Sequence, residues 1–230
     1  MSRARLAVVT GAGRGLGAAL IENLAEQGWD VVACVRTEPA AAAIKNDHVV
    51  PVIQDVREPV GAALLGAIGG RPVDVLVNNA GIGAPAQPLD SCDPQTILDA
   101  VDVNVAGPLR LAQALLPMLL AAPAPLIVNV SSRLGSLAAQ AAGDFAGRRT
   151  SYAYRISKAA QNMLTIALAQ ELSGRVRCWA VHPGSLTTAM GAADADTPAQ
   201  EAAARLGRLL DSPDATSPRY LSLDGPTLRW

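Results

Sequence analysis

Short apolar runs alternate with longer segments of helical spacing along most of the chain. An apolar run of roughly four to eight residues that ends in glycine or a polar residue is typical of a buried strand. Such runs predict strands at Leu6–Thr10, Val31–Val35, His48–Gln54, Val73–Val77, Leu126–Val130, Val176–Val181 and Arg219–Leu223. Helical segments lie between them, among them Ala18–Gln27, Pro59–Ile68, Pro94–Val103, 108–120 and Gln200–Leu210. This alternation predicts an α/β fold, a doubly wound and mainly parallel seven-stranded sheet with helices on both faces.

The pattern continues without an internal repeat or a linker, so residues 1–230 are predicted to form a single domain. The segment that follows Met190 is short, rich in alanine and acidic, and becomes helical only near Gln200. We expect it to form a small lid, around residues 187–212, over a ligand site.

The composition excludes several classes of protein. Apolar residues make up 50% of the chain and aromatic residues only 3%, which predicts an aliphatic core. The formal net charge of −1 argues against general binding to nucleic acid or to a membrane surface. Three widely spaced cysteines and two histidines provide neither a disulfide framework nor a metal site. No stretch approaches the length of a membrane span, since 108–120 carries Arg110, Gln113 and Pro117, and we expect a cytoplasmic location.

A glycine-rich turn, Gly11-Ala-Gly-Arg-Gly-Leu-Gly17, joins the first strand to the first helix. Glycines at positions 11, 15 and 17 let the backbone turn tightly and approach a pyrophosphate, and the helix N-terminus offers amide hydrogens to the phosphates. The spacing is Gly-x-x-x-Gly-x-Gly, which differs from the common Gly-x-Gly-x-x-Gly dinucleotide pattern. We interpret the turn as a dinucleotide site.

The second strand ends in Arg36, with no acidic residue at its end. An acidic residue at this position holds the ribose 2′-hydroxyl of NAD, whereas arginine accommodates the 2′-phosphate of NADP. Arg14 in the glycine turn reaches toward the same phosphate, and Glu38 lies past the strand. The sequence therefore favours NADP(H) over NAD(H), although Arg36 is also one of 17 arginines and NAD stays the alternative.

A second polar pair stands four residues apart, at Tyr154 and Lys158. Four residues make about one helical turn, so both side chains leave the same face. An ammonium group stabilises a phenolate, so the pair predicts a tyrosine able to exchange a proton with a carbonyl or an alcohol. The alternative is a surface helix in which the two side chains merely pass each other. Lys158 and Lys45 are the only lysines among 19 basic residues, which favours a specific use of Lys158.

Further motifs stand in order along nearly the whole chain, which together with the two above gives the set 10–17, Asp55, 78–81, Asn104, 131–136, 152–158, 183–184 and the ending 224–230. This set resembles the short-chain dehydrogenase/reductase family, and its carbonyl-reductase-like branch in particular. It implies a Rossmann-like fold and an oxidoreductase that interconverts a carbonyl and a secondary alcohol.

The resemblance also implies roles for the catalytic residues. Tyr154 would be the general acid in reduction and the base in oxidation. Lys158 would hold the nicotinamide ribose and lower the pKa of Tyr154. Ser132, preferred over Ser131, would orient the substrate oxygen, and Asn104 would support a water that links Lys158 to solvent. Tyr152 has no lysine four residues on, since Ile156 stands there.

The expected cofactor residues line the carboxyl ends of the strands. They are Gly11, Arg14, Gly15, Leu16, Gly17, Arg36, Asp55, Val56, Asn78, Ala80, Gly81, Tyr154, Lys158, Pro183, Gly184 and Thr188. Asp55 would meet the adenine amino group, and Asn78 would also brace the central strands.

One departure from the family concerns the 22 positions between Ser132 and Tyr154, a longer spacing than is common there, with 141–150 as the extra loop. The loop would border the substrate pocket, for which the candidate residues are Arg133, Leu134, Phe145, Tyr152 and Met190.

The family resemblance implies a homodimer or homotetramer built on the helices at 94–120 and 152–173. Two other functions stay open: an NAD-dependent alcohol dehydrogenase of the same fold, and a dinucleotide-binding regulatory or signalling protein with little turnover.

Overall fold

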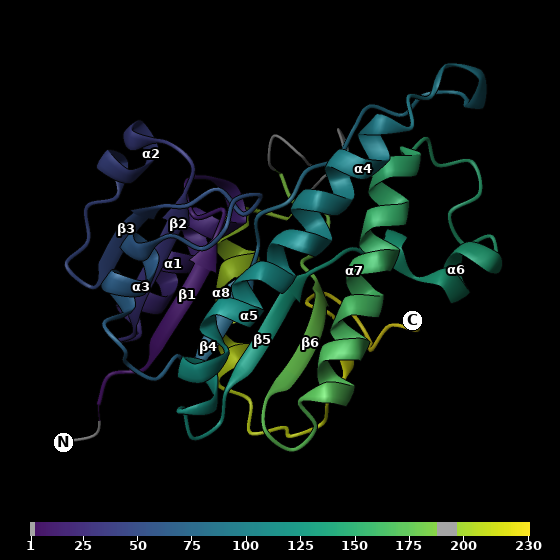
Figure 1. Cartoon of the computed structure of the whole chain (residues 1–230). Helices are drawn as coiled ribbons and strands as arrows, with labels where there is room; N and C mark the ends of the chain where they lie inside the picture. The colour runs from purple at the N-terminus through teal and green to yellow at the C-terminus, as the bar shows by residue number, and fades with distance from the viewer. Residues whose placement is uncertain (1–2, 188–196) are drawn as a thin grey trace.

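The computed structural model describes residues 3–187 and 197–230, and within them the predicted seven-stranded sheet is confirmed. The strands are β1 (Leu6–Thr10), β2 (Asp30–Val35), β3 (Val49–Ile53), β4 (Val75–Asn78), β5 (Leu126–Val130), β6 (Arg177–His182) and β7 (Arg219–Ser222). Each neighbouring pair is parallel, in the order β3-β2-β1-β4-β5-β6-β7. The carboxyl ends of the strands therefore meet at one edge, the upper edge in Figure 1, where the winding direction switches between β1 and β4.

Helices cover both faces of the sheet (Figure 1). Helices α1 (Gly15–Glu26) and α8 (Ala199–Leu210), with the short α2 (Glu38–Ala43), pack on one face. Helices α3 (Ala62–Ile68), α5 (Gly107–Leu120) and α7 (Tyr152–Glu171) pack on the other. In β1, Ala7 and Val9 belong to the first core and Leu6 and Val8 to the second. The strand is buried on both sides, which explains why it is apolar throughout.

The segment that was expected as two helices is one continuous helix. Helix α4 (Gln95–Val101) passes through a π-helical turn, η2 (Asp102–Ala106), directly into α5. At 26 residues it is long and apolar enough to cross a membrane by length and composition, so the expectation that no stretch approaches that length is wrong. Leu111 and Leu115 are fully buried in the second core, and 44% of the most apolar 18 residues of this helix are buried inside the protein.

The predicted lid does not extend through α8. Ala202, Leu206 and Leu210 are buried in the core that α8 shares with α1, and Gly207 allows close contact because a Cβ there would lie 2.3 Å from Asn23 Oδ1. The amphipathic spacing of this helix therefore serves the core. Residues 188–196 of the expected lid lie outside the described part of the chain.

Trp230 and Tyr220 hold the segment that follows β5 in place. It contains η3 (Arg133–Gly135) and α6 (Leu137–Ala141); a further short turn, η1 (Leu89–Ser91), precedes α4. The backbone carbonyl of Trp230 accepts a hydrogen bond from Ala138 N at 2.9 Å, and the Trp230 ring stacks on Tyr220 with centroids 5.1 Å apart. Tyr220 Oη donates in turn to the backbone carbonyl of Ser132. We call Trp230 and Tyr220 the carboxyl-terminal clamp.

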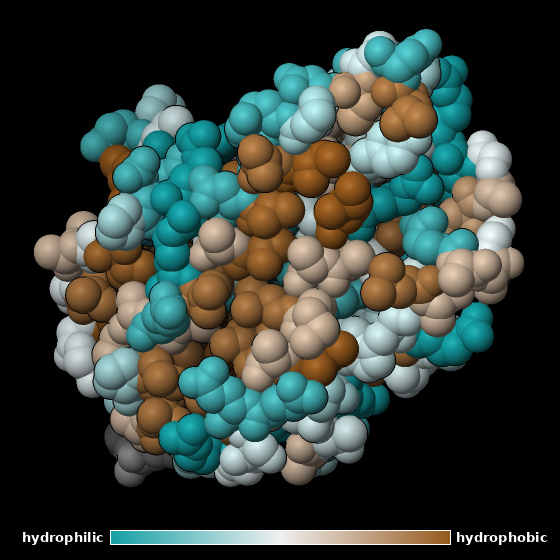
Figure 2. Space-filling view, turned by 45° about the vertical axis from the view of Figure 1, so that its right-hand side comes forward, coloured by the Kyte–Doolittle hydropathy of each residue, from teal (hydrophilic) through white to brown (hydrophobic). Residues whose placement is uncertain are grey.

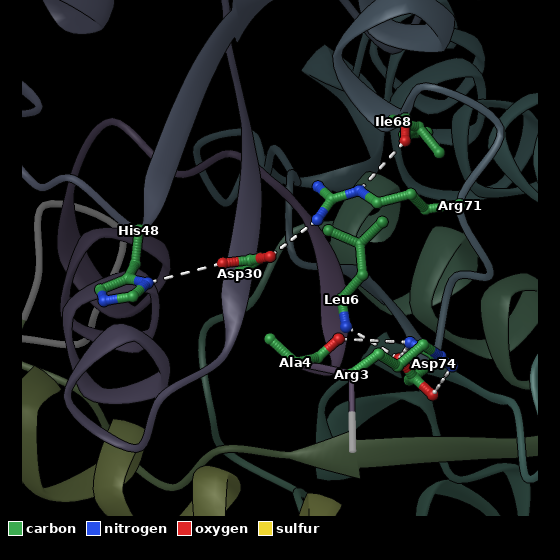
Figure 3. A network of polar contacts seen from close by, with 8 residues as sticks. All are labelled: Arg3, Ala4, Leu6, Asp30, His48, Ile68, Arg71 and Asp74. Atoms are coloured by element: carbon green, nitrogen blue, oxygen red, sulfur yellow. Dashed lines mark hydrogen bonds and ion pairs between the residues drawn. The ribbon is translucent and has the colours of Figure 1, made fainter. Parts of the chain in front are cut away.

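Ion pairs hold the opposite edge of the sheet, where the strands begin (Figure 3). Asp74, just before β4, accepts two hydrogen bonds of 2.7 Å from Arg3 and one of 2.8 Å from Leu6 N. Asp30, which begins β2, pairs with Arg71 at 2.7 Å. These contacts join the starts of β1, β2 and β4. The candidate site lies at the other edge, where the strands end.

Candidate active site

The glycine turn between β1 and α1 has the conformation that the sequence predicts. Gly11 has φ +65°, and a Cβ there would lie 2.8 Å from Ala80 Cα. A Cβ on Gly17 would lie 2.3 Å from Gly11 O. Any side chain at either position would collide with backbone, so glycine is required here.

Asn79 ties the glycine turn to the loop after β4, and the sequence analysis missed it. Its Nδ2 donates to Thr10 O at 2.9 Å and to Gly11 O at 3.2 Å. Thr10 Oγ1 accepts from the backbone N–H groups of Asn79 and Ala80, both at 3.0 Å. The asparagine lies inside the Asn78-Asn-Ala-Gly81 motif, so the motif was the signal that could have found it.

The amino end of α1 is available to an anion. Arg14 is the N-cap residue and no side chain caps the first turn, where Gly15, Leu16 and Gly17 present their backbone N–H groups. Arg14 and Arg36 are exposed, and within residues 3–187 and 197–230 neither forms an ion pair. The uncapped helix end, with the exposed charge of Arg14 beside it, suits a phosphorylated ligand.

The carboxylate expected to meet adenine is held by a neighbour. Asp55 accepts from Arg57 Nη2 at 2.7 Å and from Arg57 Nε at 3.2 Å, and this contact lowers the pKa of Asp55. Arg36 also lowers this pKa through its charge. The carbonyl of Val56 accepts from Arg110 at 3.2 Å. Asp55 is therefore ionised and fixed at the end of β3.

Asn78 braces the central strands, as expected. Its Nδ2 donates to Asn129 Oδ1 at 2.9 Å, and both amides are buried. Asn129 Nδ2 then donates to Thr165 Oγ1 on α7, also at 2.9 Å. The side chain of Asn78 is thus used within the protein, beneath the edge that carries Ala80 and Gly81.

Three of the four expected catalytic side chains meet where β5 ends and α7 begins. Tyr154 and Lys158 leave the same face of α7, and Lys158 Nζ lies 5.8 Å from the centre of the Tyr154 ring. Ser132, just after β5, acts to lower the pKa of the Tyr154 phenol, which places the two side chains near each other. Ser131 Oγ instead donates to Asn162 Oδ1 at 2.6 Å, which supports the choice of the second serine. The ring of Tyr152 lies 5.6 Å from the guanidinium of Arg155, away from this group.

The expected lowering of the tyrosine pKa is not what this structure gives. Burial raises the pKa of Tyr154, and Ser132 opposes this only in part. Burial also lowers the pKa of Lys158 from 10.5 to about 7. The expectation neglected desolvation, which here outweighs the charge of a lysine whose hydrogen bonds go elsewhere.

Lys158 Nζ donates to Val130 O at 2.8 Å and to Gln161 Oε1 at 2.9 Å. Its side chain is 4% exposed. The sequence analysis did not predict a role for Gln161, because helical spacing alone does not show whether a buried position carries an apolar residue or a polar one with a function.

Asn104 lies in the π-helical turn and is fully buried. Its Oδ1 accepts from Ile82 N, and its Nδ2 donates to Ile82 O and to Ser157 Oγ, each at 2.9 Å. Ser157 Oγ donates to Tyr154 O at 3.2 Å. The amide therefore links the loop after β4 to the turn of α7 that carries the tyrosine. A π-helical turn inside an α-helix is frequently found at a functional site.

The remaining predicted residues are placed as follows. Gly184 after β6 has φ +94°, and a Cβ there would lie 3.2 Å from Asp224 Oδ2. Pro183 precedes it and is half-buried. Of the pocket candidates, Arg133, Leu134, Phe145 and Tyr152 are half-buried, whereas Met190 and the cofactor candidate Thr188 lie outside the described residues.

The parallel sheet, the glycine turn and the serine–tyrosine–lysine group at one edge define a dinucleotide-binding α/β oxidoreductase. A sequence profile described as short chain dehydrogenase matches residues 5–199, and the chain belongs to this family. The chain is 36% identical over 162 residues to the C-signal protein of Myxococcus xanthus. The aligned region covers 69% of this chain and 93% of that protein.

Two solved structures have the same fold over the whole chain. The NADPH-bound carbonyl reductase from chicken fatty liver superposes with a TM-score of 0.85 at 28% identity and covers 100% of both chains. The carbonyl reductase Sniffer of D. melanogaster has a TM-score of 0.87 at 27% identity and covers 99% of this chain and 100% of its own. The expected family and its carbonyl-reductase-like relatives are confirmed.

Proposed function

We propose that this protein is an NADP(H)-dependent oxidoreductase that interconverts a carbonyl compound and a secondary alcohol. The observation that carries the proposal is the pairing of Tyr154 with the buried Lys158 on one face of α7, with Lys158 Nζ 5.8 Å from the centre of the tyrosine ring. The pair stands at the strand edge that also holds the glycine turn, so a proton donor and a dinucleotide site would lie at the same edge of the sheet.

The side chains divide the reaction between them. NADPH, when bound, supplies the hydride. Ser132 Oγ donates a hydrogen bond to the carbonyl oxygen and orients it. Tyr154 Oη gives its proton to that oxygen as negative charge develops, and takes it back in the oxidative direction. The Lys158 ammonium stabilises the phenolate that remains. Asn104 supports the site by fixing Ile82 and Ser157.

The residues at the strand ends fit a phosphorylated dinucleotide. The observation behind this fit is the uncapped first turn of α1, beneath a glycine turn that has no room for a Cβ. Its N–H groups would hold the pyrophosphate, and Arg14 and Arg36 the 2′-phosphate. The remaining contacts would come from Asp55, Val56, Asn78, Ala80, Gly81, Pro183, Gly184 and Thr188. The NADPH in the chicken relative supports the same choice of cofactor.

A dinucleotide-binding signalling protein with little turnover is the second candidate, and the similarity to the C-signal protein favours it. Such a protein would bind NADPH without consuming it. Retention of Ser132, Tyr154 and Lys158 in one group supports the enzyme instead.

The proposal includes a homodimer, cytoplasmic in location. Figure 2 shows apolar side chains gathered on the side of the molecule that carries α4, α5 and α7. Leu98, Ile156 and Met163 on these helices are 61%, 43% and 56% exposed. Ile156 and Met163 are two helical turns apart, so they share one face that a second copy would cover. Light scattering after gel filtration tests the assembly, and cell fractionation tests the location.

The experiment that tests the function is NADPH oxidation over a panel of aldehydes, ketones, quinones and pteridines, with a matched NADH series. Tyr154→Phe should lower kcat/KM by about 10²–10⁴ because the proton donor is gone. Tyr152→Phe is the matched control: it removes a phenol that has no lysine four residues on, so kcat should be retained even if KM for the substrate changes. NADPH binding with no turnover across the panel would favour the signalling protein, and an undiminished Tyr154→Phe enzyme would contradict the assigned proton donor.

A further inference from the structure

A fully buried amide lies one helical turn beyond the lysine of the site. Gln161 is 0% exposed, and its Oε1 accepts a hydrogen bond from Lys158 Nζ at 2.9 Å. Its Nε2 is also buried and has no hydrogen-bond partner among residues 3–187 and 197–230. A buried amide that is only half satisfied needs a physical reason, because an apolar side chain would avoid the loss.

The reason is the ammonium group. Of the three N–H groups of Lys158, one is donated to Val130 O and one to Gln161 Oε1. If the amide were turned over, Nε2 and Nζ would face each other as two donors, so the ammonium fixes the orientation of the glutamine. The orientation that directs Oε1 of Gln161 toward the ammonium therefore leaves Nε2 without a hydrogen bond, which is unfavourable for folding.

Within residues 3–187 and 197–230, no carboxylate accepts a hydrogen bond from Lys158 Nζ. The titratable neighbour on α7 is Tyr154, and β5 contributes the carbonyl of Val130. On the loop after β4, a Cβ added to Gly81 would lie 3.7 Å from Lys158 Nζ and 3.2 Å from Asn104 Oδ1 of the π-helical turn. Within the described residues Lys158 forms no ion pair, and burial brings its pKa to about 7.

Gln161 is itself held in place. Its backbone carbonyl accepts from Thr165 Oγ1 at 2.9 Å, and the same hydroxyl accepts from Asn129 Nδ2. Asn129 is bonded to Asn78 at the end of β4. This chain of buried hydrogen bonds fixes the turn of α7 that carries Gln161 against β5 and β4, so the position of its amide oxygen is defined by the core.

We propose that Gln161 is a positioning residue that holds the ammonium of Lys158 in the active site and favours its protonated form. The proposal rests on the proposed function, because a charged Lys158 beside Tyr154 is what that reaction requires. A neutral acceptor has a specific advantage over a carboxylate here: it stabilises the charge without an ion pair that would compete with Tyr154 and a ribose for the ammonium.

The first test follows Lys158 directly in the cofactor-free protein. Because Lys45 and Lys158 are the only lysines, protein labelled with ¹³Cε-lysine gives two side-chain signals, and a Lys45→Arg variant assigns them. Gln161→Met keeps the length of the side chain and removes the acceptor, so the titration midpoint of Lys158 should fall by about one pH unit. Gln161→Glu supplies a charged acceptor, and the midpoint should rise above that of the wild type.

Leu206→Ala is the control for general loss of stability. It opens a cavity in the core that α8 shares with α1, on the other face of the sheet from α7, so the Tm should fall while the Lys158 midpoint stays within about 0.3 pH unit of the wild type. If Gln161→Met does not fold, Gln161→Leu replaces it. Midpoints that coincide in all variants, or that move in the same direction for Met and Glu, overturn the proposal.

The second readout is the pH dependence of NADPH oxidation. The alkaline limb of kcat/KM should move down in Gln161→Met and up in Gln161→Glu, in step with the NMR midpoints. The two tests separate the two hypotheses. If no carbonyl is reduced, the proposed function fails while the titration still decides the role of Gln161. If the alkaline limb of kcat/KM does not move in either Gln161 variant while Tyr154→Phe abolishes turnover, the proposed role of Gln161 is wrong. The proposed function is then still supported.

Discussion

The ammonium of Lys158 lies 5.8 Å from the centre of the Tyr154 ring, but it donates its hydrogen bonds to Val130 and Gln161. The lysine is thus within electrostatic reach of the tyrosine and is not bonded to it. A buried charge in this position is unfavourable for folding, as its lowered pKa indicates. The active site therefore reduces stability at the pH where the lysine is charged.

This gives a signed dependence of stability on pH. The pKa of Lys158 falls from 10.5 to about 7 on folding, so between these values the unfolded chain binds more protons at this residue than the folded one. The free energy of unfolding contributed by Lys158 must then rise with pH, by at most about 1.4 kcal/mol per pH unit. The penalty is complete below pH 7 and is relieved above it.

The measurement is urea unfolding of the wild type and Lys158→Met at intervals from pH 6.5 to 9.5. The free energy of unfolding of the wild type, relative to that of the variant, should rise by roughly 2–3 kcal/mol across this range. The pKa of Cys34, which burial raises to about 12, affects both proteins equally and cancels. Parallel stability curves would mean that Lys158 has an ordinary pKa in the folded protein.

Arg36 provides the prediction for cofactor choice. Its guanidinium is exposed after β2 and free of ion pairs in the described part of the chain, so Arg36→Ala should remove a charge-assisted contact to the 2′-phosphate. The Kd for NADPH should rise about 10- to 100-fold, and the Kd for NADH less than about threefold. Fluorescence titration measures both, with the exposed Arg175 as a matched Arg→Ala control. An equal rise in Kd for NADPH and NADH would contradict the proposed preference for NADP.

Asn104 should be required for both stability and activity. Asn104→Ala leaves the backbone groups of Ile82 without their partners in the interior, which should lower the free energy of unfolding by about 2–4 kcal/mol. A Cβ on Gly83 would lie only 3.3 Å from Tyr154 Cδ2, so movement of this loop would also displace the tyrosine. Asn104→Asp keeps the acceptor for Ile82 N but turns a carboxylate oxygen toward Ile82 O in the interior, so it should not restore the stability of the wild type. A variant as stable as the wild type would show that the loop is held by other contacts.

The carboxyl-terminal clamp should affect substrate binding more than chemistry. Trp230→Ala removes the stack on Tyr220, and we expect the Tm to fall by about 3–8 °C. KM should rise more than kcat falls, because the segment after Ser132 loses its anchor while Tyr154 and Lys158 keep theirs. The neighbouring Arg229 is exposed and 4.0 Å from Asp144, so Arg229→Ala is the control and should change little.

At the far edge of the sheet, Asp74 should contribute stability without contributing to turnover. Asp74→Ala removes the paired contact with Arg3 and leaves Leu6 N–H without its acceptor. The free energy of unfolding should fall by about 1–3 kcal/mol, while kcat/KM in conditions where the variant is folded should stay within about twofold. A large loss of kcat/KM in the folded variant would mean that the two edges are coupled.

Sequence periodicity was enough to predict the sheet, since each strand is apolar and flanked by glycine or polar residues. It failed where one element continues into another. The segment around Asp102–Ala106 was expected to separate two helices, but the chain passes through a π-helical turn there, stabilised by the contacts of Asn104 with Ile82 and Ser157. Tertiary contacts of this kind have no signature in local spacing.

The same limit applies to the site. Motif spacing was sufficient to place Tyr154 and Lys158 on one face, because they stand one helical turn apart, whereas Ser132 was predicted from the family resemblance. It was not sufficient to predict the pKa values, which depend on burial, or the roles of Asn79 and Gln161, which depend on partners distant in sequence. A buried amide is recognisable only once its surroundings are known.

Contact between Trp230 and the turn behind Ser132 has a practical consequence for work with this protein. A purification tag or fusion partner joined after Trp230 would begin beside the contacts with Ala138 and Tyr220 that anchor that turn. Recombinant versions tagged at the two ends are therefore not equivalent reagents, and kinetic constants should be taken from the amino-terminally tagged or cleaved form.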